Sequence, residues 1–107
     1  MRSRKLTESS ILKAVLLRLR YHHRIAWAER INTGAYAVEG RYVRYGFPGC
    51  SDVIGQLRDG RMLAIEVKRP LGRITSAQDA FLQRVRANGG VAGIVRSIDD
   101  LEALLSK

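Results

Sequence analysis

The chain has 107 residues, of which 46% are apolar, and nineteen Lys and Arg against ten Asp and Glu give a formal net charge of +9. This length and composition predict one globular domain over residues 1–107 and exclude a membrane-spanning helix, so we expect a cytoplasmic protein. A single cysteine, Cys50, excludes an internal disulfide and is expected to be a small buried filler.

The positive charge favours a polyanionic partner, with nucleic acid the leading candidate. A merely basic, solvated surface is the alternative. Binding to an anionic membrane would require a cationic helix with a broad apolar face.

The first predicted element is a helix. Apolar residues recur at helical spacing over residues 8–20, and Thr7 stands where an N-cap is expected. The following stretch, RIAWAERINTGAYAVEGRYVRYG, is rich in strand-forming residues and contains three glycines, so it predicts two or three short strands with turns.

Two strands, a helix, a strand and a helix follow. An Asp59-Gly60 hairpin signal separates the two strands, Thr75 to Gln78 form a capping box for the helix, and Ser97 caps the last helix. The three predicted strands cover residues 52–57, 62–67 and 91–95. The predicted order is α-βββ-α-β-α.

The stretch MLAIEVKRP places two charges in an apolar strand. Glu66 and Lys68 share one face of it with Ala64, because alternate side chains point the same way. Charges in such a place usually pair or bind something, since desolvation costs several kcal/mol per ion. The simpler interpretation is an ion pair at the end of a strand.

Other polar residues are expected to converge on Glu66. Glu8 lies on the apolar face of the first helix, and Gln78 lies on the inward face of the second at its first turn. Asp52 opens the strand that pairs with the one carrying Glu66 and Lys68. Two carboxylates and one lysine are then predicted to meet.

The position of Asp52 depends on the hairpin loop. If Asp59 and Gly60 alone form it, Glu66 lies opposite Val53 and Asp52 faces away. If residues 58–60 form it, with Gly60 left-handed in a bulge, Asp52 lies opposite Glu66 on the same face. We predict the second register, or a bend at Asp52 with the same effect.

Two carboxylates and a backbone carbonyl such as that of Val67 form a hard oxygen site that suits Mg²⁺ or Mn²⁺. Lys68 would hold or activate the attacking water, and Gln78 would orient the water or Lys68. Glu8 would bind a metal through water or hold a second one. The chemistry predicted is hydrolysis of a phosphodiester.

The motif GCSD, followed fourteen residues on by EVK and then by ITSAQ, resembles the D…(D/E)-x-K nucleases, and specifically the VRR-NUC (virus-type replication-repair nuclease) domain. The resemblance implies a restriction-endonuclease-like α/β fold, with an α-βββ-α-β core, a mixed sheet flanked by helices and a short C-terminal helix. It implies metal ligands at Asp52, Glu66 and the Val67 carbonyl, a catalytic Lys68, and supporting roles for Glu8 and Gln78.

Stand-alone phage and bacterial members of this family look like homodimeric nucleases of branched DNA. By resemblance, we expect a Mg²⁺- or Mn²⁺-dependent endonuclease of four-way junctions, in a bacterial or phage-infected cell. A nuclease of flaps or duplex ends, or a non-catalytic DNA-binding subunit, is the alternative. The dimer contact, if it is not ordinary packing, would involve Tyr36, Tyr42, Val43 and Tyr45.

Several other residues have weaker predicted roles. Arg41, Arg44, Arg69 and Arg73 would flank the site and contact phosphates, unless they form a solvated basic face. Asn32 and Thr33 before Gly34 are expected to form a turn rather than to contact DNA. His22 and His23 lack a third His or Cys for a zinc site. Trp27 and Phe81 are expected in the core rather than as surfaces for base stacking, since each lies in an apolar pattern.

Overall fold

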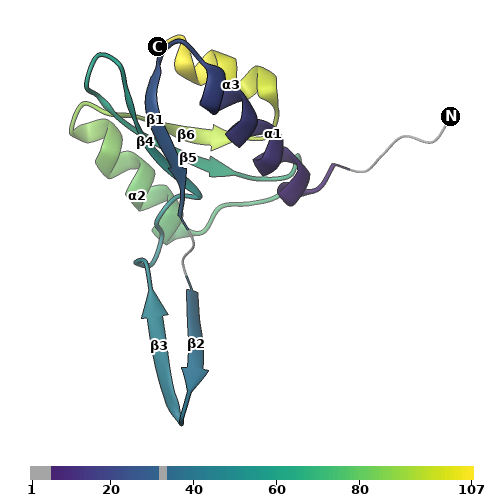
Figure 1. The fold of residues 1–107 in the computed structure, drawn as a ribbon, viewed down its shortest axis with the longest axis vertical. Coiled ribbons are helices and arrows are strands. Elements are labelled where there is room, and N and C mark those ends of the chain that lie inside the picture. Colours follow the sequence, from purple (N-terminus) through teal and green to yellow (C-terminus); the bar gives the residue numbers. More distant parts are fainter. Residues whose placement is uncertain (1–5, 32–33) are drawn as a thin grey trace, which may run out of the picture.

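The computed structural model describes residues 6–31 and 34–107, which form three helices and six strands (Figure 1). In chain order the elements are α1 (Glu8–Tyr21), β1 (Ile25–Arg30), β2 (Gly34–Val38), β3 (Arg41–Tyr45), β4 (Val53–Leu57), β5 (Met62–Val67), α2 (Ser76–Ala87), β6 (Val91–Val95) and α3 (Ile98–Leu105). No helix among them is both long enough and apolar enough to cross a membrane.

The main sheet is mixed, with the strand order β1-β4-β5-β6. β4 is antiparallel to both β1 and β5, whereas β5 and β6 are parallel. α1 and α3 cover one face of the sheet and α2 covers the other, as Figure 1 shows. The predicted α/β class with a mixed sheet flanked by helices is confirmed.

β2 and β3 are the main departure from the predicted order. They form a separate two-stranded sheet between β1 and β4 in the chain, and this hairpin projects away from the main body (Figure 1). Its turn has positive φ angles of 49° at Glu39 and 76° at Gly40, as a tight two-residue hairpin turn requires. The predicted βββ unit is therefore β1, β4 and β5, with the hairpin inserted into it.

The β4–β5 register is the one predicted. Val53 lies opposite Ile65, and the Leu57 amide donates to the carbonyl of Arg61 at 2.9 Å, which leaves residues 58–60 as the loop. Gly60 closes the loop with a φ of 98°. One step beyond Val53, the same register places Asp52 opposite Glu66.

The helix starts also follow the sequence. Thr7 caps α1 in a reciprocal box with Ser10, and Thr75 caps α2 in the predicted box with Gln78. Ser97 caps α3. These caps fix the first turns of α1 and α2, where Glu8 and Gln78 lie.

The structure confirms two of the residues expected to be buried and contradicts a third. Phe81 and Cys50 are buried as predicted, but the prediction for Trp27 was wrong, because 47% of its surface is exposed. Trp27 belongs to the edge strand β1, whose outer side no other strand covers among the described residues. Its apolar neighbours in sequence therefore indicated a strand but not burial.

His22 is buried for a structural reason. Its Nε2 lies 3.2 Å from a carboxylate oxygen of Glu102, and its Nδ1 accepts from the Arg24 amide at 3.1 Å. Glu102 also accepts from Arg18 at 2.6 Å, and these bonds lower the pKa of the Glu102 carboxyl, Arg18 contributing most. This cluster joins α1 to α3.

Gly49 positions the turn that leads into Asp52. Its φ is +82°, and a Cβ there would collide with the carbonyl oxygen of Ala77 in the first turn of α2. We expect Gly49→Ala to lower the melting temperature by about 10 °C, from left-handed strain plus overpacking. Circular dichroism melts would measure this.

Gly89 offers a matched control. It has a φ of +87°, but a Cβ added there would meet no atom of the described chain within 4 Å. Gly89→Ala should carry only the conformational cost, about half the loss of Gly49→Ala. Equal losses for the two variants would show that the contact with α2 contributes nothing.

Candidate active site

Glu66 is the centre of the candidate site. It is only 2% exposed, and it lies on the face of β5 that α2 covers. Gln78, in the first turn of α2, donates its Nε2 hydrogen to Glu66 Oε1 at 3.2 Å. The Nζ of Lys68 lies 3.9 Å from the same oxygen, while Glu66 Oε2 is buried with no hydrogen-bond donor among the described residues.

Asp52 meets this group from the end of β4. One of its carboxylate oxygens accepts the Val67 amide at 2.8 Å, and its backbone carbonyl accepts the amide of Ile31 at 2.7 Å. The amide and carbonyl of one strand residue point to the same side, so the Val67 carbonyl is also directed to the Asp52 side. The predicted meeting of Asp52, Glu66 and Lys68 is observed.

Burial and charge raise the pKa of Glu66 to about 8. Burial is the largest cause of the raised pKa, followed by the adjacent carboxylate of Asp52, with Lys68 opposing the shift and Glu8 adding to it. Burial and the adjacent negative charge of Asp52 both disfavour the ionised form of Glu66, so near neutral pH they favour its protonated form.

Glu8 is placed at the rim rather than inside. It is exposed in the first turn of α1, where it lines a cleft of about 330 Å³ together with Asp52, Lys13 and Arg30. Among residues 6–31 and 34–107, no three His, Cys, Asp or Glu side chains come close enough together to hold a metal ion. Glu8 is therefore near Asp52 without forming a three-carboxylate cluster.

The donors that do meet suit a hard divalent cation. They are the Asp52 and Glu66 carboxylates and the carbonyl of Val67, all oxygen, and one Glu66 oxygen has no other partner in the part of the chain that the structure describes. Mg²⁺ is bound by one or two carboxylates and keeps several waters, so this donor set fits Mg²⁺ or Mn²⁺.

The four predicted phosphate-binding arginines lie in two separate places. Arg69 and Arg73 are exposed in the loop that follows Lys68. Arg41 is exposed beside the turn of the β2–β3 hairpin, away from the main body (Figure 1), and the side chain of Arg44 lies outside the described residues. Only the first pair adjoins Glu66 along the chain.

Three further residues near the site were not predicted. Arg96 donates to the carbonyls of Arg69 at 2.9 Å and Gly72 at 2.6 Å, and so ties down the loop after Lys68. Lys13 and Arg30 line the Asp52 cleft. Arg30 pairs with Val53, next to Asp52. This pairing could not be predicted from the local sequence, because the inserted hairpin separates the two residues in the chain.

This fold, with an aspartate, a glutamate and a lysine at the ends of β4 and β5, is that of a nuclease domain. The family model for the VRR-NUC domain matches residues 6–99, and the chain belongs to this family. Searches of curated proteins and of solved structures give no match.

The raised pKa of Glu66 predicts a stability effect. Between the ordinary value of 4.5 and about 8, the folded chain holds a proton that the unfolded chain has released. The free energy of unfolding therefore falls as the pH rises through this window. We expect Glu66→Gln to melt about 5 °C higher than the wild type at pH 8 in EDTA, because the cost of burying the charge is removed.

The difference should vanish near pH 4, where wild-type Glu66 is protonated in both states. Thermal melts of both proteins across this pH range would measure it. Glu29→Gln, which changes an exposed glutamate on β1, serves as the control and should leave the pH dependence unchanged. A Glu66→Gln protein that melts lower than the wild type at pH 8 would contradict the assignment of charge burial.

Proposed function

We propose that the protein is a Mg²⁺- or Mn²⁺-dependent DNA endonuclease that acts on branched DNA, with four-way junctions as the preferred substrate. The observation that carries the proposal is the buried Glu66 carboxylate beside Asp52 in a nuclease fold, one of its oxygens having no partner within the described residues. Burying such a group is costly unless a ligand completes it.

In this proposal Asp52, Glu66 and the Val67 carbonyl are the metal ligands, and Glu8 contributes through water from the rim of the cleft. A bound divalent cation would polarise the phosphoryl oxygen and make a water easier to deprotonate. Glu66 must give up its proton to serve as a ligand, so metal affinity should rise with pH.

Lys68 and Gln78 act on either side of Glu66. The Lys68 ammonium, 3.9 Å from Glu66, is placed to hold the attacking water and to offset the charge that develops on the phosphate. The Gln78 amide, bonded to Glu66, fixes the orientation of the carboxylate. Arg69 and Arg73, with Arg41 and Arg44 on the hairpin, supply sequence-independent phosphate contacts.

A homodimer follows from the number of sites. Two nicks in opposed strands need two active sites, and this chain supplies one. The β2–β3 hairpin projects from the body and exposes Tyr42, so it is the proposed contact; the side chains of Tyr36, Val43 and Tyr45 lie outside the described residues. Cleavage of flaps or duplex ends, or DNA binding without cleavage, would use the same scaffold.

The test of catalysis is cleavage of a labelled four-way junction, beside linear duplex and single strand, in Mg²⁺, Mn²⁺ or EDTA. We expect paired symmetric nicks in the junction, lost in EDTA, and a loss of at least about a hundredfold in rate for Lys68→Ala and Asp52→Asn. Both variants should still bind the junction, because backbone contacts do not depend on them.

The control for these variants is a melting curve with and without Mn²⁺. Mn²⁺ should stabilise the wild type and not Asp52→Asn. Wild-type cleavage rates in Lys68→Ala would refute its proposed role, and junction binding without cleavage in either metal would favour a non-catalytic DNA-binding subunit.

The dimer is tested by light scattering. We expect a mass of about twice the 12.0 kDa of the chain at micromolar concentration, and the monomer mass for Tyr42→Glu, which places a charge in the proposed contact. Tyr21→Glu, at an exposed tyrosine on α1, is the matched control. A wild-type mass of one chain at every concentration would rule the dimer out.

A further inference from the structure

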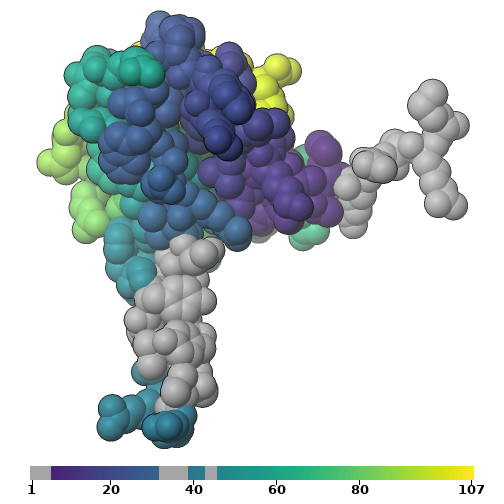
Figure 2. All heavy atoms as spheres, viewed as in Figure 1, coloured from purple at the N-terminus to yellow at the C-terminus, as the bar shows by residue number. Residues whose placement is uncertain are grey.

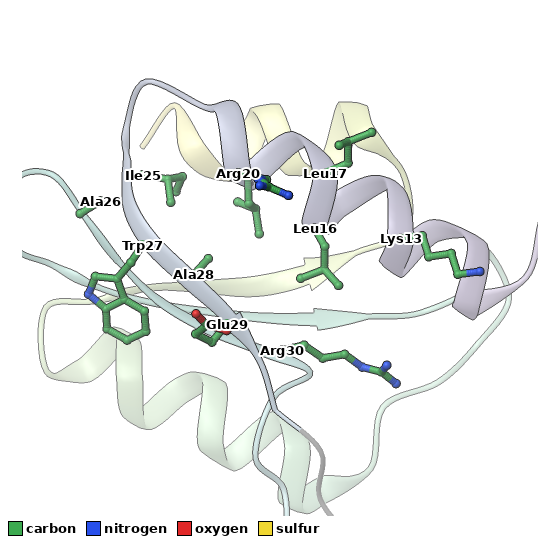
Figure 3. Close-up of a pocket in the computed structure, with 11 residues that line it drawn as sticks. Lys13, Leu16, Leu17, Arg20, Ile25, Ala26, Trp27, Ala28, Glu29 and Arg30 are labelled. Atoms are coloured by element: carbon green, nitrogen blue, oxygen red, sulfur yellow. The ribbon is translucent and has the colours of Figure 1, made fainter.

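A second feature of the surface is a groove that follows the open edge of β1. Its volume is about 690 Å³, and Figure 3 shows the residues that line it, from α1 on one side and β1 on the other. Figure 2 shows that α1 and β1 lie side by side on this surface of the molecule. The proposed chemistry at Glu66 and Asp52 does not use this groove.

The groove is basic on its α1 side. Lys13 and Arg20 of α1 and Arg30 of β1 line it, all three exposed, and Glu29 contributes a carboxylate to its lining. Glu29 and Trp27 pair with Ile54 and Gln56, which belong to the face of the sheet away from α1. The cations therefore lie along one side of the β1 edge, and Glu29 and Trp27 lie on the other, so a ligand that contacts both the cations and Trp27 must cross this edge.

Trp27 offers a fixed aromatic surface at this edge. Its Nε1 donates to Gln56 Oε1 at 3.0 Å, and Gln56 in turn donates to the Gly60 carbonyl at 3.1 Å. Although the indole is held by these bonds, it remains 47% exposed. A half-exposed aromatic ring held in one orientation is a suitable surface for stacking a planar group.

The groove is continuous with the Asp52 cleft. Lys13, Leu16 and Arg30 line both the groove and the cleft, which also contains Glu8 and Asp52. A chain molecule that passes Asp52 can therefore extend past Arg30 and along β1 to Trp27.

The backbone of β1 adds donors to this path. In β1 the alternate residues Trp27 and Glu29 bond to β4, as the Ile31 bond to Asp52 shows, so the amides of Ala28 and Arg30 point outward. Open amides beside three cations favour an anionic ligand. A second copy of this chain would bring its own three cations to the same edge, which opposes symmetric pairing of two β1 strands.

We infer that this groove binds a single, unpaired DNA strand that leads away from the cleavage site, with a base stacked on Trp27 and phosphates on Lys13, Arg20 and Arg30. The strand is single because a base can stack on a side chain only when its face is not already covered within a duplex. This inference rests on the proposed function for its substrate, DNA. It requires an unpaired strand beside the cut, which a flap provides and which a four-way junction provides only where base pairs open at its branch point.

Trp27 is the one tryptophan of the chain, so its fluorescence reports on the groove directly. The experiment titrates the whole protein with a short mixed-sequence single strand, a blunt duplex or polyglutamate, in EDTA so that no cleavage occurs. We expect saturable quenching by the single strand, and an affinity at least about tenfold weaker for the duplex.

Variants are measured by anisotropy of the labelled single strand. Trp27→Ala should bind about tenfold more weakly, and Trp27→Phe, which keeps a ring, should lose less. In the double variant Lys13→Ala, Arg20→Ala, the slope of log affinity against log salt should fall by about 1.4, as expected for two lost contacts to a single strand. Arg84→Ala, at an exposed arginine of α2, is the matched control and should keep the wild-type slope.

Several results would overturn the inference. They are equal quenching by duplex and single strand, equal quenching by polyglutamate, an unchanged affinity in Trp27→Ala, or a wild-type dimer that Trp27→Ala converts to a monomer. The titration does not depend on cleavage. If the protein cuts DNA but no ligand quenches its fluorescence, only the inference about the groove is wrong. If the single strand quenches the fluorescence but no DNA is cut, the inference about the groove stands and the proposed nuclease function is wrong.

Discussion

The pairing of β4 with β5 is the constraint on which the rest of the site depends. A three-residue loop ending in left-handed Gly60 sets a register that puts Asp52 opposite Glu66, and the Val67 amide then holds the Asp52 carboxylate at 2.8 Å. Shifting this register by one residue would turn Asp52 to the other face of the sheet. A surface turn therefore decides whether the two carboxylates meet.

The close approach of these two carboxylates destabilises the fold when no ligand is bound. A buried glutamate beside an aspartate has its pKa raised to about 8, and within residues 6–31 and 34–107 one of its oxygens lacks a donor. The surrounding structure tolerates this because two elements hold the pair in place. Gln78 is fixed by the cap of α2, and Lys68 is fixed through its amide to Val95 at the end of β6. Buried ionisable groups that are held rigidly at such an energetic cost are typical of binding and catalytic sites.

The sequence predicted those features that arise from local chemistry. They are the Asp59-Gly60 loop, the N-cap at Thr7, the capping box at Thr75, and the alternation that puts Glu66 and Lys68 on one face. Each could be predicted because it depends on residues a few positions apart. The candidate ligands followed from them. The family resemblance added the assignment of the fold.

Features that depend on segments far apart in the chain could not be predicted from the sequence. Trp27 looks like a core residue in its own stretch of sequence, and its exposure follows from β1 lying at the edge of the sheet. The same holds for Arg30, which reaches the Asp52 cleft only because β1 pairs with β4 across the inserted hairpin. Arg96 contacts the loop after Lys68 from the far end of β6, which no local pattern could indicate.

The distribution of charge links these separate features. Two carboxylates repel the phosphate that must approach them, so a site of this kind needs cations close by. Lys13 and Arg30 line the cleft beside Asp52, Lys68 lies against Glu66, and Arg69 and Arg73 follow in the next loop. The cationic side chains behind the net charge of +9 are therefore not spread evenly. Part of this charge lies where a polyanion would otherwise be repelled by the site, which ties the composition of the chain to the position of its two acids.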